Sequence, residues 1–434
     1  MNKEKIKALL RFRWLVFFIL SLAYFLVYFH RLSLSVVAND LVKDFQTTAG
    51  TIGMLGSIYF YCYAIMQLPA GLLSDSIGPR KTVTFFLIIA SAGSIFFGFA
   101  PNIETAFAGR VMVGLGVSMV FIPAMKILSQ WFRAREFALM AGILNAVGGA
   151  GVLAATWLLA LMVARFGWRV SFEMIGACTL IIVVLAWLIV RDQPADKGFP
   201  TLAEIDNKGK EAPAPANQIG LWEGARRVVS EKYFWPLALW YFFDCGIFFG
   251  FGALWSGPYL MHVYGMTRAE AGAVLSMIAW GMIVGSPVLG FLSDRILKSR
   301  KKVFVFCTSG LTLLLLFFCI FPSDLSRITL YVLFFIFSIC ASCIVAIGFT
   351  MTKELFPVEI AGTSVGTVNL FPFLGGAVFM PILGKVLDAY PKSTAGYSVD
   401  AYSMILLILF GTSLAALVCT LVMKETFPVD VPNQ

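Results

Sequence analysis

Charged side chains are scarce in this chain. Asp, Glu, Lys and Arg make up 13 % of its 434 residues, whereas 59 % of the residues are hydrophobic. An average soluble domain carries about 25 % charged residues. The composition therefore excludes an ordinary water-soluble globular protein and indicates one that lies in a membrane.

The motifs of nucleotide-driven and metal-dependent enzymes are also lacking. No phosphate-binding P-loop is present, so we expect that ATP does not drive this protein directly. The two histidines and the carboxylates do not cluster as metal ligands do. All eight cysteines fall in apolar runs, and the CxxC of Cys340 and Cys343 has no second ligand pair nearby. We expect no enzyme, no cofactor and no metal.

Long apolar runs are what the chain has in abundance. Runs of about 20 residues are long enough to cross a bilayer as helices. We expect twelve spans, at about 14–37, 51–74, 82–100, 104–127, 137–162, 169–190, 234–262, 268–292, 303–322, 327–350, 361–388 and 400–423. The first run is too long for a cleavable signal peptide, so we expect it to stay as a membrane helix.

Basic residues predict the orientation. With the N-terminus in the cytoplasm, most of the 33 Lys and Arg residues fall in cytoplasmic segments, as the positive-inside rule requires. Both termini are then cytoplasmic. The net charge of +9 reflects this topology and contact with lipid headgroups, and we expect no nucleic-acid partner.

Two sequence segments each occur twice, which indicates an internal duplication. GLLSDSIGPRK (71–81) matches GFLSDRILKSRKK (290–302), and WFRAREFALMAGILN (131–145) matches LFPVEIAGTSVGTVN (355–369). The longest polar stretch separates the two copies. We therefore predict an N-terminal bundle over 1–190, a cytoplasmic linker over 191–232 and a C-terminal bundle over 233–434.

These motifs resemble those of the major facilitator superfamily. The G-x-L-S-D-x-x-G-P-R-K loop, GRVMVGLG (109–116) and FGWRVSFEMIGA (166–177) all have counterparts there. The resemblance implies an all-α membrane fold of two pseudo-symmetric six-helix bundles that expose a site to alternate sides. It also implies a cytoplasmic latch, which would comprise Gly71, Asp75, Gly78, Arg80, Lys81, Gly290, Asp294 and Arg295.

Arg31 is the first candidate for binding substrate. Tyr24, Tyr28 and Arg31 share one helix face through their i, i+4, i+7 spacing. A guanidinium beside two phenols suits a carboxylate or a phosphate, because its fork binds such groups bidentately. The alternative is that Arg31 lies near the external end and snorkels outward.

Polar stripes in other helices extend the candidate pocket. Tyr59, Tyr63 and Gln67 follow one face of the second span, and Trp255 and Tyr259 lie on one face with Asp244. The repeated Asn145 and Asn369 either line the pocket or join helices. The full predicted substrate set is Arg31, Tyr24, Tyr28, Tyr59, Tyr63, Gln67, Asn145, Trp255, Tyr259 and Asn369.

Three ionisable residues within the spans are candidates for proton coupling. Asp244 lies about 15 Å into its helix, so its carboxylate either carries a proton or pairs with a cation. His30 has an ordinary pKa near neutrality, and Arg110 belongs to the helix 4 motif of the superfamily. Whether Lys126 and Glu173 serve function or structure stays open.

The preferred hypothesis is a proton-coupled secondary transporter of a small organic anion, such as a carboxylate, a sugar acid or a sugar phosphate. The helix 1 Arg and PADKG (194–198) resemble the organophosphate and organic-anion branches. Asp244 stands where the organophosphate branch typically has a second Arg, so a zwitterionic amino acid or small peptide is a rival substrate. A transporter-like membrane sensor is a second alternative. We expect a monomer in a bacterial inner membrane.

Overall fold

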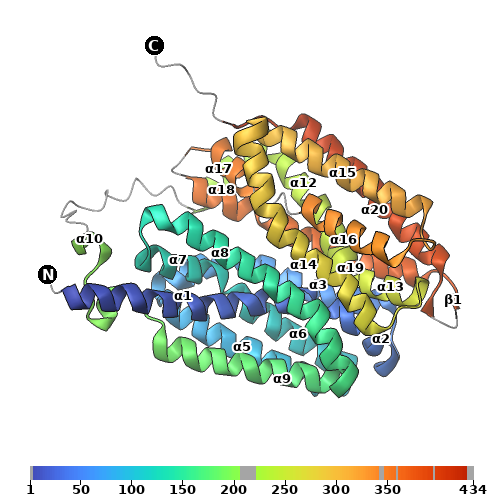
Figure 1. Ribbon diagram of the computed structural model, residues 1–434, viewed down its shortest axis with the longest axis horizontal. Coiled ribbons are helices and arrows are strands. Elements are labelled where there is room, and N and C mark those ends of the chain that lie inside the picture. Colours follow the sequence, from blue (N-terminus) through green and yellow to red (C-terminus); the bar gives the residue numbers. More distant parts are fainter. Residues whose placement is uncertain (1–2, 206–220, 342–346, 358–359, 394–395, 428–434) are drawn as a thin grey trace, which may run out of the picture. The chain divides into compact units, whose positions relative to one another are not determined.

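The computed structural model describes residues 3–205, 221–341, 347–357, 360–393 and 396–427. These residues are almost entirely helical (Figure 1). They form two compact units, the first comprising residues 1–47 and 58–214 and the second comprising 48–57 and 215–434. Helix α3 is shared between them.

The first unit is built from helices. They are α1 (Lys3–Leu32), α2 (Leu34–Asp44), the later part of α3 (Ala49–Ile65), α4 (Gln67–Ser76), α5 (Pro79–Gly98), α6 (Ile103–Ser118), α7 (Phe121–Trp131), α8 (Ala134–Leu153), the π-helical η1 (Ala154–Leu158), α9 (Leu159–Ile189), the 3₁₀ turn η2 (Pro194–Lys197) and α10 (Leu202–Ile205).

The second unit adds one short hairpin to its helices. Its elements are α11 (Leu221–Ser230), α12 (Phe234–Ile247), η3 (Phe248–Trp255), α13 (Ser256–Val263), α14 (Arg268–Phe291), η4 (Leu292–Leu297), α15 (Arg300–Ile320), α16 (Arg327–Ala341), α17 (Phe349–Leu355), α18 (Ala361–Val368), α19 (Leu370–Asp388), β1 (Lys392–Ser393), β2 (Gly396–Tyr397) and α20 (Val399–Val422). Strands β1 and β2 pair antiparallel.

The helices account for the predicted spans. Nine described helices are long and apolar enough to cross a membrane, and the bent pair of α3 and α4 makes ten. The 51-residue helix 139–189 contains two predicted spans, because Gly167 breaks it with a φ of +79°. The predicted span 327–350 corresponds to α16 and α17, and Cys343 lies outside the described residues.

Proline explains two breaks within spans. Pro69 cannot donate to the carbonyl of Ile65, and Pro123 cannot donate to that of Met119. The chain breaks at these places, between α3 and α4 and between α6 and α7. The spans predicted over 51–74 and 104–127 are therefore each two helices rather than one.

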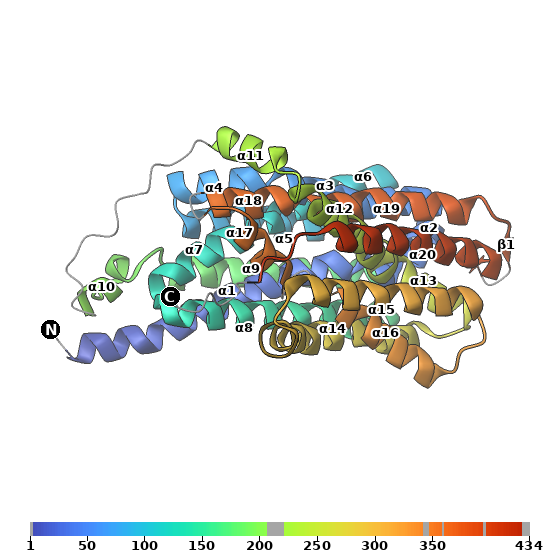
Figure 2. The ribbon, with the colours of Figure 1, turned by 90° about the horizontal axis from the view of Figure 1, so that it is seen from above.

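Helices pack closely within each unit. In the first, α5 packs on α6 and α9, and α1 packs on α8. A Cβ on Gly93 would lie 2.9 Å from the carbonyl oxygen of Gly109, so α5 and α6 touch backbone to backbone. In the second unit, α15 lies beside α20 in both views (Figures 1 and 2).

Candidate functional site

Tyrosine rings surround Arg31 in the first unit. Its guanidinium carbon lies 4.6 Å from the ring centroid of Tyr28 and 5.0 Å from that of Tyr63. The ring of Tyr24 contacts that of Tyr28 at 5.4 Å, and Tyr59 lies 6.1 Å from Tyr63. Helices α1 and α3 thus bring five of the predicted site residues together. Arg31 is only 6 % exposed.

Arg110 lies next to this cluster and makes structural contacts. Both of its terminal nitrogens donate to the backbone carbonyl of His30, at 3.3 and 3.4 Å. Its guanidinium carbon lies 5.1 Å from the ring of Tyr59, whose hydroxyl donates to the carbonyl of Val27. Arg110 therefore ties α6 to the end of α1.

His30 is fully buried, and neither ring nitrogen has a hydrogen-bond partner in the described part of the chain. The side-chain amide of Gln67 donates to the backbone carbonyl of Tyr63 at 3.3 Å. Asn145, on α8, is half-buried. Among the described residues, no hydrogen bond joins its side chain to the tyrosine cluster.

Asp244 is the buried carboxylate of the second unit. It lies on α12, is 1 % exposed, and neither of its oxygens accepts a hydrogen bond from any described residue. A carboxylate in apolar surroundings without donors is costly when charged. The arrangement therefore favours either a protonated acid or a cationic ligand.

Two aromatic candidates in the second unit donate hydrogen bonds to backbone carbonyls. The indole of Trp255 donates to the carbonyl of Met380 at 3.0 Å, and the hydroxyl of Tyr259 donates to that of Pro322 at 2.6 Å. Asn369 lies at the junction of α18 and α19. The two aromatic groups thus use their polar atoms on backbone carbonyls of their own unit.

The first signature loop is held from within its unit. Lys126 Nζ lies 2.6 Å from Asp75 Oδ1 and donates to the carbonyl of Ser74 at 2.9 Å. Lys126 is therefore a partner of the predicted latch. Gly78 has a φ of +94°, a backbone conformation that glycine adopts without strain, and Lys81 is exposed.

Asp192 completes the first loop, and sequence reasoning did not identify it. Its carboxylate accepts from the backbone N–H of Arg80 at 2.6 Å, which caps α5. The guanidinium of Arg80 donates to the carbonyl of Trp187 and lies 4.3 Å from its ring centroid. No spacing rule links Asp192 to residue 80, because the contact forms only when α9 packs on α5.

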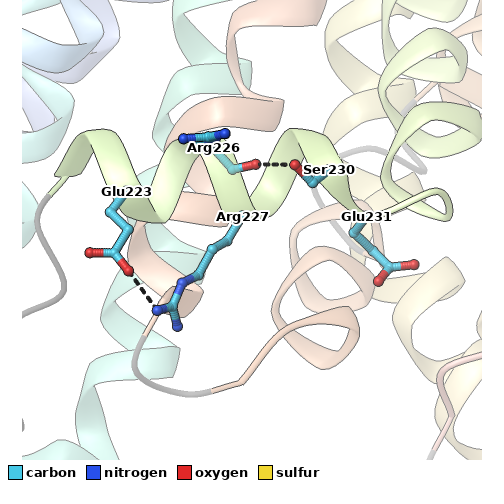
Figure 3. Close-up of a pocket in the computed structure, with 5 residues that line it drawn as sticks. All are labelled: Glu223, Arg226, Arg227, Ser230 and Glu231. Atoms are coloured by element: carbon cyan, nitrogen blue, oxygen red, sulfur yellow. Dashed lines mark hydrogen bonds and ion pairs between the residues drawn. The ribbon is translucent and has the colours of Figure 1, made fainter.

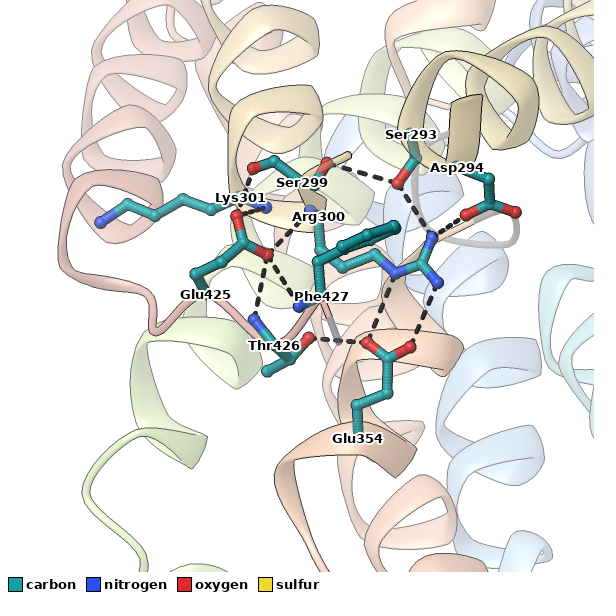
Figure 4. A network of polar contacts seen from close by, with 9 residues as sticks. All are labelled: Ser293, Asp294, Ser299, Arg300, Lys301, Glu354, Glu425, Thr426 and Phe427. Atoms are coloured by element: carbon teal, nitrogen blue, oxygen red, sulfur yellow. Dashed lines mark hydrogen bonds and ion pairs between the residues drawn. The ribbon is translucent and has the colours of Figure 1, made fainter. Parts of the chain in front are cut away.

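Arg300 is the centre of the second loop (Figure 4). It pairs with Asp294 and, at 3.1 Å, with Glu354. Arg295, the residue chosen from the sequence, is exposed and has no ion pair within the described ranges. The sequence comparison selected Arg295 because it follows Asp294 directly. In the structure, the chain turns at Lys298, which has a φ of +44°, and this turn places Arg300 beside the carboxylates of Asp294 and Glu354.

The segment after α20 joins this network. Glu425 accepts from the side chain of Ser299 and from the backbone N–H of Arg300 at 2.9 Å, so it caps α15. Thr426 donates to Glu354 at 2.8 Å. Burial alone would raise the pKa of Glu425, but the hydrogen bonds from Ser299 and from nearby N–H groups outweigh burial and lower it.

Two further ion pairs hold the ends of the first unit. Arg13 pairs with Glu136 at 2.9 Å, and Arg169 pairs with Asp44 at 2.5 Å. The indole of Trp168 also donates to Asp44, and this bond, followed by the contacts with Arg169, lowers the pKa of that carboxyl despite partial burial. Glu173 is half-buried against Gly98.

A surface pocket lies along α11 (Figure 3). Its lining residues all belong to that helix or to the turn that follows it: Glu223, Arg226, Arg227, Ser230 and Glu231. Arg227 pairs with Glu223 at 2.6 Å, and both are more than half exposed. The pocket is a feature of one amphipathic helix and lies outside the membrane-spanning helices.

The chain resembles known transporters over nearly its whole length. An uncharacterized transporter of Bacillus subtilis, YybO, is 25 % identical, with 94 % of this chain and 95 % of that protein covered. The probable galactarate/D-glucarate transporter GarP of Escherichia coli K12 is 23 % identical, with 94 % of each chain covered. A probable hexose phosphate transport protein of Chlamydia trachomatis is 24 % identical, covering 92 % of this chain and 90 % of that one.

A solved transporter structure has a similar fold. The nucleoside transporter NupG superposes with a TM-score of 0.74 at 13 % identity, covering 93 % of this chain and 99 % of that one. The family model of the Major Facilitator Superfamily matches residues 20–257 and 237–433. The chain therefore belongs to the Major Facilitator Superfamily, and the family and its relatives are membrane transporters, not enzymes.

Proposed function

We propose that this protein is a secondary active transporter of a small organic anion, and that Arg31 binds the anionic group. The observation that carries the proposal is the guanidinium of Arg31, buried among the rings of Tyr28 and Tyr63 within the first unit. The rings keep the guanidinium plane oriented, so its fork can meet a carboxylate or a phosphate without first losing rotational freedom.

The relatives support sugar acids as the first class to test. GarP is named for galactarate and D-glucarate, both of which are polyhydroxylated carboxylates, and the C. trachomatis relative is named for hexose phosphate. Phenol hydroxyls suit the hydroxyl groups that these classes share, and a guanidinium suits either anionic end.

Proton movement is the proposed energy source, with Asp244 as carrier. A carboxylate that is buried and lacks donors among described residues holds a proton readily, and releases it when water or a cation reaches it. His30 and Arg110 are the secondary candidates. The protein would alternate access as a monomer in a bacterial inner membrane, with both termini in the cytoplasm.

A zwitterionic substrate is the second candidate, and Asp244 is the observation that favours it. An unpartnered buried carboxylate suits an ammonium group as well as a proton. An amino acid or a small peptide would then place its carboxylate on Arg31 and its amine on Asp244.

Ligand-induced stabilisation followed by transport tests the proposal. Purified protein is melted with sugar acids, other carboxylates, sugar phosphates, amino acids and dipeptides. A ligand at 100 times its Kd stabilises by about 2.7 kcal/mol. We expect an anion to raise the Tm of the wild type and not that of Arg31→Ala. If only zwitterions act and Asp244→Asn abolishes their effect, the second candidate replaces the first.

Uptake into proteoliposomes then separates transport from sensing. We expect the stabilising ligand to accumulate when a proton gradient is imposed. A ligand that binds but never crosses the membrane would contradict the proposal and support a transporter-like sensor.

A further inference from the structure

A glycine of α8 lies against the tyrosines that surround Arg31. Helix α8 packs on α1 within the first unit. A Cβ built on Gly148 would lie 2.7 Å from Cδ2 and 2.8 Å from Cε2 of the Tyr28 ring, and 3.3 Å from Cε1 of Tyr24. Carbon atoms in contact are normally about 3.5–4.0 Å apart. The ring of Tyr28 therefore occupies space that the side chain of any other residue at position 148 would need.

The same ring contacts Arg31. The guanidinium carbon of Arg31 lies 4.6 Å from the ring centroid of Tyr28, within the range of a cation–π contact. Both side chains are buried. A shift of the ring would therefore change its contact with the guanidinium.

The neighbours of Tyr28 limit how its side chain can move. The ring of Tyr24 contacts that of Tyr28 at 5.4 Å, and it also contacts the ring of Phe121 on α7 at 5.4 Å. A Cβ on Gly151, about one turn further along α8, would lie 3.2 Å from the Cβ of Tyr28. A displaced ring must therefore turn about its own side-chain bonds, which changes its distance or its tilt relative to Arg31.

The contact at Gly148 differs in kind from the contact at Gly151. A Cβ on Gly151 would meet the carbonyl oxygen of Phe25 at 2.3 Å, and this oxygen belongs to the backbone of α1. At Gly148 the nearest atoms belong to a side chain, which can rotate. A methyl group at position 148 should thus move Tyr28 with little loss of fold stability.

We propose that Gly148 is a positioning residue for anion binding, because the lack of a side chain there lets the Tyr28 ring lie where it stacks on Arg31. A guanidinium held against a ring keeps its fork in one plane, which favours bidentate recognition of a carboxylate or a phosphate. Gly148 acts through Tyr28. The inference rests on the proposed binding of an anion by Arg31.

Gly148→Ala and Gly142→Ala test the inference as a matched pair. Both variants add one methyl group to α8, but a Cβ at Gly142 would meet nothing within 4 Å among the described residues. Fluorine NMR of the ligand-free protein labelled with fluorotyrosine reports the ring, and the resonance that Tyr28→Phe removes is that of Tyr28. Calorimetry gives the Kd of D-glucarate and, as a second probe, of glucose 6-phosphate.

We expect Gly148→Ala to shift the Tyr28 resonance and to raise the Kd of a bound probe about tenfold, as the loss of one cation–π contact predicts. Gly142→Ala should change neither the resonance nor the Kd, and the two variants should have similar Tm values without ligand. In a Tyr28→Ala background, Gly148→Ala should change the Kd less than about twofold, because no ring is left to displace.

Four results would overturn the inference in a protein that binds a probe. They are an unmoved Tyr28 resonance, an unchanged Kd in Gly148→Ala, a tenfold effect that persists in the Tyr28→Ala background, and a Tm that falls together with the affinity. The last result would mean that Gly148 serves helix packing. If the wild type binds neither probe, the proposed anion binding fails and the role of Gly148 in it fails too, whereas the NMR shift reports separately on the ring.

Discussion

At the scale of single residues, the contacts of each ionisable side chain indicate whether it serves structure or is a candidate for function. Arg110 is buried, yet its donors meet a backbone carbonyl. Lys126 is an ion-pair partner of Asp75. Arg31 stacks on aromatic rings, and Asp244 has no donor among the described residues. These two residues are therefore the ones for which we propose roles in binding.

Arg31→Lys tests whether geometry matters beyond charge. The variant keeps the positive charge but loses the planar fork and its contacts with Tyr28 and Tyr63. Each such contact contributes about 0.5–2 kcal/mol, so we expect the Kd of the anion to rise about tenfold or more. The measurement is the ligand-induced shift in Tm. Arg165→Lys, which alters a similar contact with Phe166, should leave the shift unchanged.

Asp244→Asn separates coupling from stability. An amide costs less to bury than a charged carboxylate, so we expect the variant to be at least as stable as the wild type. Proton-driven accumulation in proteoliposomes should fall to the level of passive exchange, while exchange of labelled for unlabelled substrate persists. Accumulation at the wild-type rate would exclude Asp244 as the proton carrier.

At the scale of helices, glycine decides which pairs can approach. On α8, a Cβ at Gly151 would clash with the carbonyl oxygen of Phe25 on α1, whereas one at Gly142 would meet nothing within 4 Å among the described residues. Both glycines look alike in the sequence. Only the packing of α8 on α1 distinguishes them.

Gly151→Ala and Gly142→Ala form a matched pair. Overpacking typically costs about 1–3 kcal/mol, so Gly151→Ala should lower the Tm. Gly142→Ala should leave it unchanged or raise it slightly, because alanine favours helix by about 0.5–1 kcal/mol. Thermal unfolding in detergent measures both variants, and equal Tm values for the two would contradict the packing described.

The cap that Glu425 places on α15 predicts a pH dependence. Its pKa is lowered in the folded protein, so its contribution is present above the ordinary glutamate pKa of about 4.3 and is lost as pH falls through the folded value. We expect Glu425→Gln to cost about 1 kcal/mol near neutral pH, with the difference in Tm from wild type shrinking below pH 4. Glu223→Gln, at an exposed pair, should show no such difference.

At the scale of the whole molecule, the repeated segments and the length of the apolar runs determine how spans and loops alternate along the chain. The two copies of the charged loop each sit between spans, and each is held by ion pairs inside its own unit. The copies differ in detail: Lys126 serves the first loop, and Arg300 with Glu354 and Glu425 serves the second.

Reporter fusions test the proposed orientation. With twelve spans and the positive-inside bias, both termini should lie in the cytoplasm. A fluorescent protein that folds only in the cytoplasm should therefore be bright at either end, and alkaline phosphatase, active only outside, should be inactive at both. Opposite behaviour at the two termini would mean an odd number of spans.

The sequence by itself determined the membrane location, the spans, the duplication and the superfamily. These follow from composition, run length and short motifs, which are local properties of the chain. The sequence also predicted that Tyr24, Tyr28 and Arg31 lie together, because the spacing of residues alone decides which of them share a face of a helix.

The tertiary structure decided which charges meet. Asp192 with Arg80, Glu425 with the start of α15, and Asp388 with the start of α3 join residues far apart in the sequence. The sequence of a single helix does not specify these partners, because each contact forms only where the ends of two packed helices lie side by side. The tertiary structure also decided that Arg300, and not Arg295, pairs with the carboxylates, because the turn between η4 and α15 determines which guanidinium reaches them.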